Sequence, residues 1–324
     1  MIKNIAIVMG GYSSEVNISL VSGNVVYNHL DKEKYNPFRV HILKDKWVAL
    51  DDESTEYPID KNDFSFLLGD KKITFDCVFN AIHGNPGENG ELLAYFNLVN
   101  LKHTSAPYYQ MALTFNKRDT LSVVKEYGIK TAISIYLNKG DEVDVDRIIA
   151  KVGLPCFIKP NNAGSSYGIS KAHTKEEILP AIEVAYKEDS EILIESFLDG
   201  TEVSVGVIQY KGETKVLPIT EIVSENDFFD YEAKYEGKSQ EITPARISEE
   251  EKLRVEEVAE KVYKVLNMSG FSRSEYIFVA GEPHFLEMNT VPGLTEESIL
   301  PQQAQASGIS LSELFENAIE SALK

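Results

Sequence analysis

The sequence has little means of forming covalent cross-links. Two of its 324 residues are cysteines, Cys77 and Cys156, and each lies in a short apolar run that is typical of a strand. An apolar setting of this kind predicts a buried, reduced thiol rather than a disulfide or a catalytic nucleophile.

Long apolar runs are equally absent. A membrane-spanning helix needs about 18 apolar residues, whereas the apolar run near the N-terminus covers residues 5–9 and is followed by Gly10 and Gly11. This run is too short for the apolar core of a signal peptide. We therefore expect no membrane segment, no secretion signal and a cytoplasmic protein.

Positive charge is scarce. The chain has 32 lysine and arginine residues against 51 aspartate and glutamate residues, which gives a formal net charge of −19. Such a surface repels nucleic acid and anionic membranes, so we expect neither as a partner. A local cluster of the few cations could still hold a nucleotide. The apolar fraction of 43% is ordinary for a globular protein.

Strands and helices alternate in the first third of the chain. The apolar run at residues 5–9 predicts a buried parallel strand, and a helical pattern follows at 16–30. Further strands are expected at 39–43 and 75–82. This alternation indicates an α/β unit with an open, mostly parallel sheet over residues 1–100.

Two further units are expected, at residues 101–198 and 199–324. In the second unit, Thr174 and Glu177 have the spacing of a capping box at the start of a helix. The other elements expected there are helices at 108–113 and 117–127 and strands at 131–137, 156–159 and 192–194.

The third unit is richer in long strands. Ser248 is expected to cap a helix at 249–267. A long loop of polar and aromatic residues occupies 224–240, and long irregular loops in compact domains are frequently lids. The strands are expected at 203–209, 216–222, 271–279 and 284–289, the last two joined by a turn at 280–283.

Oxygen-bearing side chains cluster on the last two expected strands. Side chains alternate along a strand, so Arg273 shares a face with Glu275, and Glu287 shares a face with Asn289. If the strands pair, these donors suit Mg²⁺, which binds oxygen ligands and substrate phosphates. A solvated strand with ordinary surface charge is the alternative, and the apolar neighbours of Glu287 argue against it.

Three further segments could contact a ligand. Lys159 ends a strand, and the loop at 160–168 could fold over phosphates, although it is not a Walker A motif and could be a plain turn. Gly293 could offer a backbone N–H, and Ser298 lies near a helix start that favours an anion. His83 follows a buried strand, where an α/β sheet places its ligands, but a lone histidine is more often structural.

Short motifs follow one another in a specific order along the chain. They are Gly10-Gly11-x-Ser13-x-Glu15 with Ser19, His83-Gly84-x-x-Gly87-Glu88-x-Gly90, Asn116-Lys117, Lys159-Pro160 with Gly164-Ser165-Ser166-x-Gly168, Asp230-Tyr231-Glu232-Ala233-Lys234-Tyr235, Gly270-x-x-Arg273, Glu287-x-Asn289-Thr290-x-Pro292-Gly293 and Ser298. In this order they resemble the D-alanine–D-alanine ligase family of the ATP-grasp superfamily, and the resemblance covers nearly the whole chain.

The resemblance implies a fold and a reaction. The fold would be a three-domain ATP-grasp architecture, α/β in the N-terminal domain and α+β in the rest, with ATP between the central and C-terminal domains. The reaction would be ATP-dependent, ADP-forming ligation of two D-alanines through an acyl phosphate, for peptidoglycan precursor synthesis. The enzyme would be a homodimer that uses two Mg²⁺ ions, which Mn²⁺ could replace.

The resemblance also implies roles for individual residues. Glu15, Ser165, Tyr235, Arg273 and Gly293 would be catalytic, and Tyr235 in the lid favours a dipeptide over a depsipeptide ending in D-lactate. ATP would be held by Lys117, Lys159, Ser165, Ser166, Glu195, Ser196, Phe197, Leu198, Glu202 and Lys234, the amino acids by Glu15, His83, Lys234, Ser298 and Ile299, and the metal ions by Glu275, Glu287 and Asn289.

Three positions depart from the usual residues of that family. Glu275 replaces the aspartate of the metal site, Asn89 replaces an aspartate, and Val16 replaces a basic residue or histidine. The longer Glu275 side chain could shift one metal ion, whereas the other two positions concern substrate binding more than the reaction.

Two other functional classes stay open. Another ATP-grasp ligase would share Lys159, Glu287 and Asn289, but would not be expected to combine them with Glu15, the lid and Ser298. A catalytically silent nucleotide-binding module would bind ATP without amino-acid-dependent phosphate release.

Overall fold

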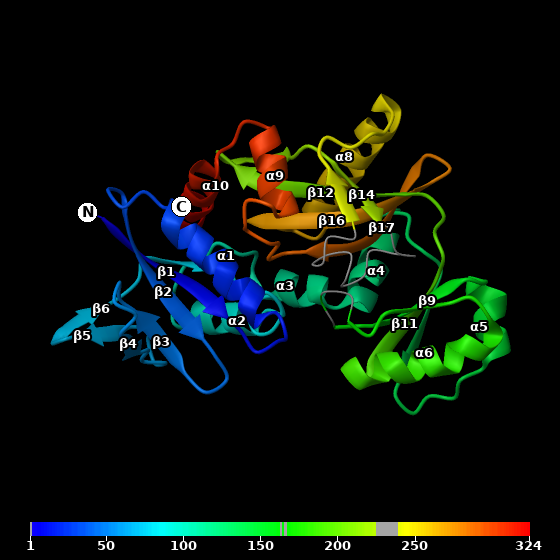
Figure 1. Cartoon of the computed structure of the whole chain (residues 1–324), viewed down its shortest axis with the longest axis horizontal. Helices are drawn as coiled ribbons and strands as arrows, with labels where there is room; N and C mark the ends of the chain where they lie inside the picture. Colours follow the sequence, from blue (N-terminus) through cyan, green and yellow to red (C-terminus); the bar gives the residue numbers. More distant parts are fainter. Residues whose placement is uncertain (1, 163, 165–166, 225–238) are drawn as a thin grey trace.

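The computed structural model describes residues 2–162, 164, 167–224 and 239–324. In this part of the chain, three larger sheets follow one another along the sequence (Figure 1). A small two-stranded sheet of β5 (Phe66–Leu68) and β6 (Lys71–Ile73) accompanies the first. No helix within the described ranges is long and apolar enough to cross a membrane.

The first sheet is parallel at its centre and antiparallel at one edge. Its strand order is β4-β3-β2-β1-β7, and β1 pairs in parallel with both β2 and β7. The expected mostly parallel sheet is thus correct for the central strands, whereas β3 and β4 are antiparallel additions. A tight turn, closed by the Leu43 N–H to Lys46 carbonyl bond of 2.8 Å, joins β2 to β3 without a crossover helix. The strands are β1 (Lys3–Gly10), β2 (Tyr35–Ile42), β3 (Trp47–Leu50), β4 (Glu56–Pro58) and β7 (Cys77–Asn80).

The C-terminal end of the chain returns to this first sheet. Helix α1 (Val16–His29) and helix α10 (Leu311–Leu323) lie beside it in Figure 1. The rings of Phe79 and Phe315 meet edge to face at 5.6 Å, inside a buried apolar cluster. Burial also raises the pKa of the Cys77 thiol to about 12, and both cysteines are buried and free, as the sequence predicted.

The middle sheet is antiparallel, with strand order β10-β9-β11-β8. The expected capping box before α6 (Lys175–Glu188) is wrong, because the Thr174 side chain makes no capping bond. The Glu177 carboxylate accepts the His173 backbone N–H instead, at 2.7 Å. The other elements of this unit are β8 (Ser134–Asn138), α5 (Val145–Val152), β9 (Cys156–Pro160), β10 (Ser170–Ala172) and β11 (Glu191–Ser196).

The third sheet carries the expected hairpin of β16 (Phe271–Val279) and β17 (Glu282–Asn289). Its turn is tighter than expected, because Ala280 and Gly281 both have positive φ and Glu282 already belongs to the strand. The predicted strand at 216–222 is divided at Pro218, which has no N–H to donate to a ladder. The remaining strands are β12 (Thr201–Tyr210), β13 (Glu213–Val216), β14 (Thr220–Ser224) and β15 (Ser239–Ile242).

Five further helices of the described chain complete the fold. Figure 1 shows α3 and α4 between the first and middle sheets, and α8 and α9 beside the third sheet. Their bounds are α2 (Glu91–Leu98), α3 (Tyr108–Phe115), α4 (Lys117–Glu126), α8 (Glu249–Val265) and α9 (Ile299–Ala306).

Replacing Ser248 by alanine should destabilise α8 without changing catalysis. Ser248 forms the predicted cap as a complete capping box with Glu251, so its loss should lower the free energy of unfolding by about 1 kcal/mol. Urea unfolding measures this loss. Thr174→Ala is the matched control, because Thr174 is an N-cap without a side-chain bond and should lose less. Equal losses in the two variants would contradict the assigned cap.

Candidate active site

A cavity of about 100 Å³ opens between the middle and third sheets. Lys159 ends β9 of the middle sheet, whereas Glu287 lies on β17 of the third sheet. Residues 128 positions apart are thus brought to one cavity, which also has an apolar side. Its lining is Lys117, Ala132, Phe157, Lys159, Ile169, Leu193, Glu195, Ser196, Leu198, Glu202, Glu275, Ile277, Leu286 and Glu287.

Lys159 is fixed in this cavity by an ion pair. Its Nζ lies 2.9 Å from Oε2 of Glu195, whose side chain is almost completely buried. Burial alone would lower the pKa of Lys159, but the negative charges of Glu195, Glu287 and Glu202 outweigh it and raise the pKa above 10.5. Lys159 therefore presents a fixed positive charge to whatever enters the cavity.

Lys117 supplies a second cation from the first turn of α4. Its Nζ lies 3.1 Å from Oε2 of Glu287. Fully buried Asn161, which follows β9, attaches the start of this helix to the middle sheet, because its side-chain oxygen accepts the Arg118 N–H at 2.9 Å. Its amide nitrogen donates to Glu191 at 2.8 Å. The sequence pattern did not single out Asn161, because its partners are known only once the helix and the sheet are placed.

The oxygen donors of the hairpin lie opposite one another. The register pairs Glu275 with Glu287 and Arg273 with Asn289. Arg273 Nη1 lies 2.6 Å from Glu275 Oε1 and 3.1 Å from Ser204 Oγ. Burial opposes the charge of Arg273, but the Glu275 carboxylate outweighs this and raises the arginine pKa. Two carboxylates and one amide, balanced by nearby cations, fit a divalent cation that also binds phosphate.

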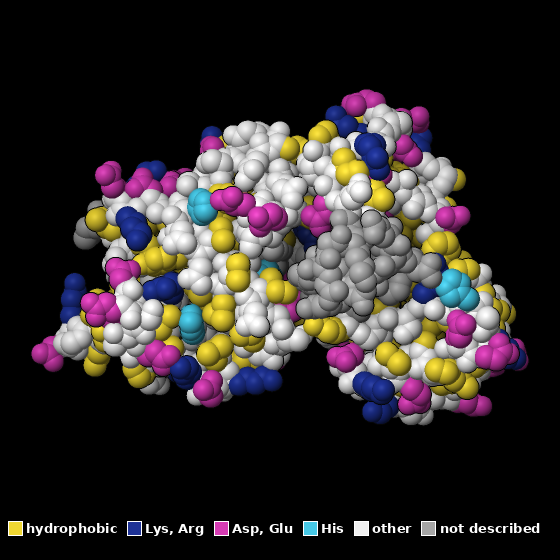
Figure 2. All heavy atoms as spheres, viewed as in Figure 1, with side chains coloured by type: hydrophobic (Ala, Val, Ile, Leu, Met, Phe, Trp, Pro, Cys, Tyr) yellow, Lys and Arg dark blue, Asp and Glu magenta, His cyan; other side chains and the backbone are white. Residues whose placement is uncertain are grey.

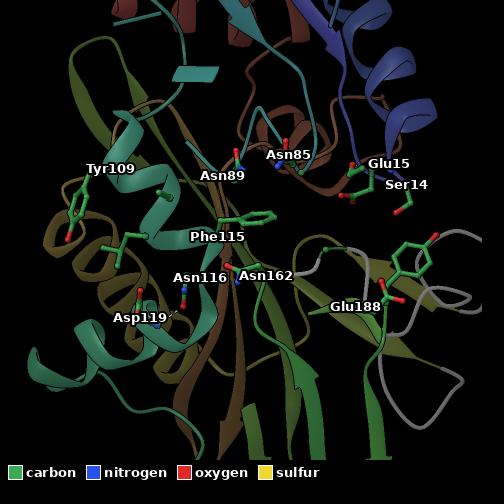
Figure 3. Close-up of a pocket in the computed structure, with 16 residues that line it drawn as sticks. Ser14, Glu15, Asn85, Asn89, Tyr109, Phe115, Asn116, Asp119, Asn162 and Glu188 are labelled. Atoms are coloured by element: carbon green, nitrogen blue, oxygen red, sulfur yellow. Dashed lines mark hydrogen bonds between the residues drawn. The ribbon is translucent and has the colours of Figure 1, made fainter. Parts of the chain in front are cut away.

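A larger cavity of about 710 Å³ lies between the first and middle units (Figure 3). Its lining includes Glu15, which immediately precedes α1, together with the side-chain amides of Asn85, Asn89 and Asn162. Gly164 approaches Glu15 so closely that a Cβ there would lie 2.9 Å from the carboxylate. None of the described residues lining this cavity is a lysine or arginine. A carboxylate in such a setting suits an ammonium group.

The segment after β17 contains the two other predicted positions near a helix start. A Cβ on Gly293 would lie 2.6 Å from Ser298 Oγ, so glycine allows this close approach. Ser298 is the N-cap residue of α9, and its hydroxyl bonds to the Thr295 hydroxyl at 2.8 Å. Ile299 is buried and packs with Ile222 of β14.

The expected ATP-binding segment at 195–202 lies mostly, but not wholly, in the first cavity. Glu195, Ser196, Leu198 and Glu202 line it, and the Ser196 hydroxyl also accepts the Ile133 N–H at 3.0 Å. Phe197 is not part of the lining, and its ring lies instead near the ring of Phe157 at 6.3 Å.

Several predicted site residues lie outside the described residues. They include the phosphate-loop serines and the centre of the expected lid, so their roles stay predictions. These residues are Ser165, Ser166, Lys234 and Tyr235.

His83 is nearly buried, and both of its ring nitrogens have protein partners. Nε2 lies 3.0 Å from Ser22 Oγ, and Nδ1 lies 2.7 Å from the Val291 carbonyl. Among the described residues, it lines neither cavity. Its predicted contact with substrate therefore has no direct geometric support.

The outer surface carries charge of both signs. Figure 2 shows acidic side chains spread over the visible face, interspersed with lysines and arginines. The cations that line the first cavity, Lys117 and Lys159, are largely buried and belong to the interior.

The three sheets and the cavity between the second and third define an enzyme of the ATP-grasp class. Sequence comparison agrees: the profile for the D-ala D-ala ligase N-terminus matches residues 4–106, and that for the D-ala D-ala ligase C-terminus matches residues 123–320. The chain belongs to the D-alanine–D-alanine ligase family.

Individual relatives are similar over their full length. A D-alanine–D-alanine ligase of Flavobacterium johnsoniae is 70% identical over 321 residues, 99% of each chain. One of Christiangramia forsetii is 60% identical over 323 residues, 100% of this chain and 99% of the relative. The solved VanG D-Ala:D-Ser ligase from Enterococcus faecalis superposes with a TM-score of 0.88 at 31% identity, over 99% of both chains. The Bacillus anthracis D-alanine–D-alanine ligase complexed with ATP has a TM-score of 0.80 at 27% identity, over 99% of this chain and 97% of the other.

Proposed function

We propose that this chain joins two molecules of D-alanine into D-alanyl-D-alanine, with conversion of ATP to ADP and phosphate, for peptidoglycan precursor synthesis. The observation that carries the proposal is the meeting of Lys117, Lys159, Glu275 and Glu287 at one cavity. The proposal is supported by a relative named D-alanine–D-alanine ligase, which is 70% identical over 99% of both chains.

The first step activates a carboxylate, which is a poor electrophile. An oxygen of the first D-alanine carboxylate attacks the γ-phosphorus of ATP, the bond to ADP breaks, and an acyl phosphate forms. Negative charge spreads over the phosphoryl oxygens, and Lys117 and Lys159, which line the cavity, would stabilise it. Glu275, Glu287 and Asn289 would hold two Mg²⁺ ions, or Mn²⁺ in their place, which neutralise further phosphate charge.

The second step forms the peptide bond. The neutral amine of the second D-alanine attacks the acyl carbon, and a tetrahedral oxyanion forms. The attacking nitrogen releases one proton, and phosphate leaves as the carbonyl is restored. Arg273 and the Gly293 N–H would stabilise the oxyanion, whereas Glu15 would hold the ammonium of the first D-alanine. Ser298 and Ile299 would contact the second D-alanine, and the lid would exclude water from the acyl phosphate.

The proposal also includes the domain boundaries, the oligomeric state and the cellular location. The chain would divide into domains at 1–100, 101–198 and 199–324, and ATP would lie between the second and third. The enzyme would be a homodimer, as the family resemblance implies. It would act in the cytoplasm, where ATP and the amino acid are both available.

Phosphate release should depend on D-alanine, ATP and Mg²⁺ together. In an amino-acid panel, D-alanine should give the highest rate, with L-alanine and D-lactate at least about tenfold lower. D-Lactate lacks the amine with which the pocket pairs, and L-alanine cannot place its amine, carboxylate and methyl group in the same three positions as the D enantiomer. D-Serine belongs in the panel, because the Enterococcus faecalis relative is a D-Ala:D-Ser ligase.

Each outcome of the panel separates the alternatives. Equal rates with L-alanine or D-lactate would refute the specificity. A different amino acid giving the highest rate would indicate another ATP-grasp ligase. Tight ATP binding without phosphate release for any amino acid would indicate a silent nucleotide-binding module.

A further inference from the structure

Side chains from the N-terminal third hold the loop that contains Gly293. The Leu294 N–H donates to Ser22 Oγ at 3.4 Å, and Ser22 Oγ lies 3.0 Å from His83 Nε2. His83 Nδ1 lies 2.7 Å from the Val291 carbonyl, so the chain of bonds starts and ends on the same loop. Ser22 is fully buried on α1, far from this loop in the sequence.

The direction of each bond in this ring follows from the chemistry. A carbonyl oxygen only accepts, so His83 must carry its proton on Nδ1 and donate it to Val291. In the neutral ring, Nε2 then has a lone pair and accepts the Ser22 hydroxyl proton. The Ser22 oxygen keeps a lone pair for the Leu294 N–H. The three hydrogen bonds are therefore compatible with one another: Leu294 donates to Ser22, Ser22 donates to His83, and His83 donates to Val291.

A carboxylate holds the other end of the same loop. Oε1 of Glu88 accepts the N–H of Thr290 at 3.0 Å and that of Val291 at 3.3 Å. Its second oxygen accepts the Gly84 N–H at 3.1 Å. Removal from water, and then the negative charge of Glu15, raise the pKa of Glu88. The loop is therefore attached on both sides of Gly293 to the first unit, although it continues from the third sheet.

We propose that Ser22 and His83 are positioning residues, which fix the Gly293 N–H by holding Val291 and Leu294 in a closed hydrogen-bond ring. This inference rests on the proposed function, since the N–H matters only if an oxyanion forms beside it. It gives His83 a role through the loop rather than on the substrate. The Ser22 hydroxyl is the essential link, because among the described residues it is the group that joins the imidazole to the Leu294 N–H.

Hydrogen exchange of the loop amides in the unliganded full chain tests the ring directly. In Ser22→Ala, the Leu294 amide should exchange about tenfold faster, because a buried hydrogen bond is lost. Ser22→Thr, which keeps a hydroxyl, should restore most of the protection. Ser65→Ala is the matched control: Ser65 is equally buried, but its hydroxyl bonds to Asp63 in the first unit. It should leave the Leu294 exchange unchanged.

Steady-state kinetics then test the consequence for the reaction. Ser22→Ala should lower kcat about tenfold with little change in the KM for ATP, because the misplaced N–H serves the transition state. His83→Asn should lower kcat similarly, and the double variant should lose no more than the worse single variant. Ser65→Ala should keep the parental kcat.

Two results would overturn the proposal. Unchanged Leu294 exchange in Ser22→Ala would show that the hydroxyl does not hold the loop. Multiplicative losses of kcat in the double variant would show that Ser22 and His83 act independently. Since exchange needs no substrate, faster exchange in an enzyme that fails the amino-acid panel would refute the proposed reaction but not the ring.

Discussion

Replacing Glu287 by alanine should lower kcat at least about 100-fold, because it removes one carboxylate of the metal site and the partner of Lys117. The measurement is D-alanine-dependent phosphate release at saturating ATP. Glu287→Gln should be similarly impaired, since the amide keeps the size but not the charge. A raised Mg²⁺ requirement should accompany any residual rate.

Glu282 on the same strand provides the control for this experiment. Its carboxylate pairs with Lys130 and Arg254 at the exposed end of the hairpin. Exposed ion pairs contribute little to stability, so Glu282→Ala should keep the parental rate and most of the stability. Near-normal turnover in Glu287→Ala would remove Glu287 from the metal site.

Replacing Lys159 by methionine should have two separable effects. ATP binding should weaken and kcat should fall about 100-fold or more, because a phosphate-facing cation is lost. Folding should also be destabilised by about 3–5 kcal/mol, because buried Glu195 is left without its partner.

The double variant Lys159→Met with Glu195→Gln separates the two effects. Removing the uncompensated carboxylate should recover most of the stability, whereas catalysis should remain lost. Recovery of activity together with stability would contradict the role of Lys159 in holding ATP. Thermal unfolding and phosphate release measure the two effects on the same samples.

The pH dependence of unfolding checks the same pair. The folded-state pKa of Lys159 is raised above 10.5, so its stabilising contribution is complete below pH 10.5 and is lost as the pH rises through the higher folded value. On the alkaline side, the melting-temperature difference between the parent and Lys159→Met should therefore begin to shrink above pH 10.5.

Much of the site could be predicted from local sequence. The alternation of side chains put Arg273 and Glu275 on one face of a strand and Glu287 and Asn289 on one face of the next, and predicted that the four converge if the strands pair. The strands do pair, with Glu275 opposite Glu287 and Arg273 opposite Asn289. The family resemblance predicted that Lys159 and Glu287 would lie at one site. In the structure both residues line the same cavity. The first prediction depended on a strong local pattern, whereas the second depended on the order of motifs along the whole chain.

The residues that the sequence did not reveal act through distant partners. Ser22 and Asn161 are small polar residues inside ordinary patterns, and their bonds to Leu294 and Arg118 exist only in the folded chain. The prediction of a capping box at Thr174 was wrong for a related reason, because the Glu177 carboxylate accepts the backbone N–H of His173. Spacing alone cannot rank such competing hydrogen bonds.

A crystal structure with a non-hydrolysable ATP analogue and Mn²⁺ tests the central claim most directly. The anomalous signal of Mn²⁺ should lie between the carboxylates of Glu275 and Glu287, with the terminal phosphates beside Lys159. Mn²⁺ bound elsewhere, or the nucleotide seated in the larger cavity beside Glu15, would contradict the assignment of this site.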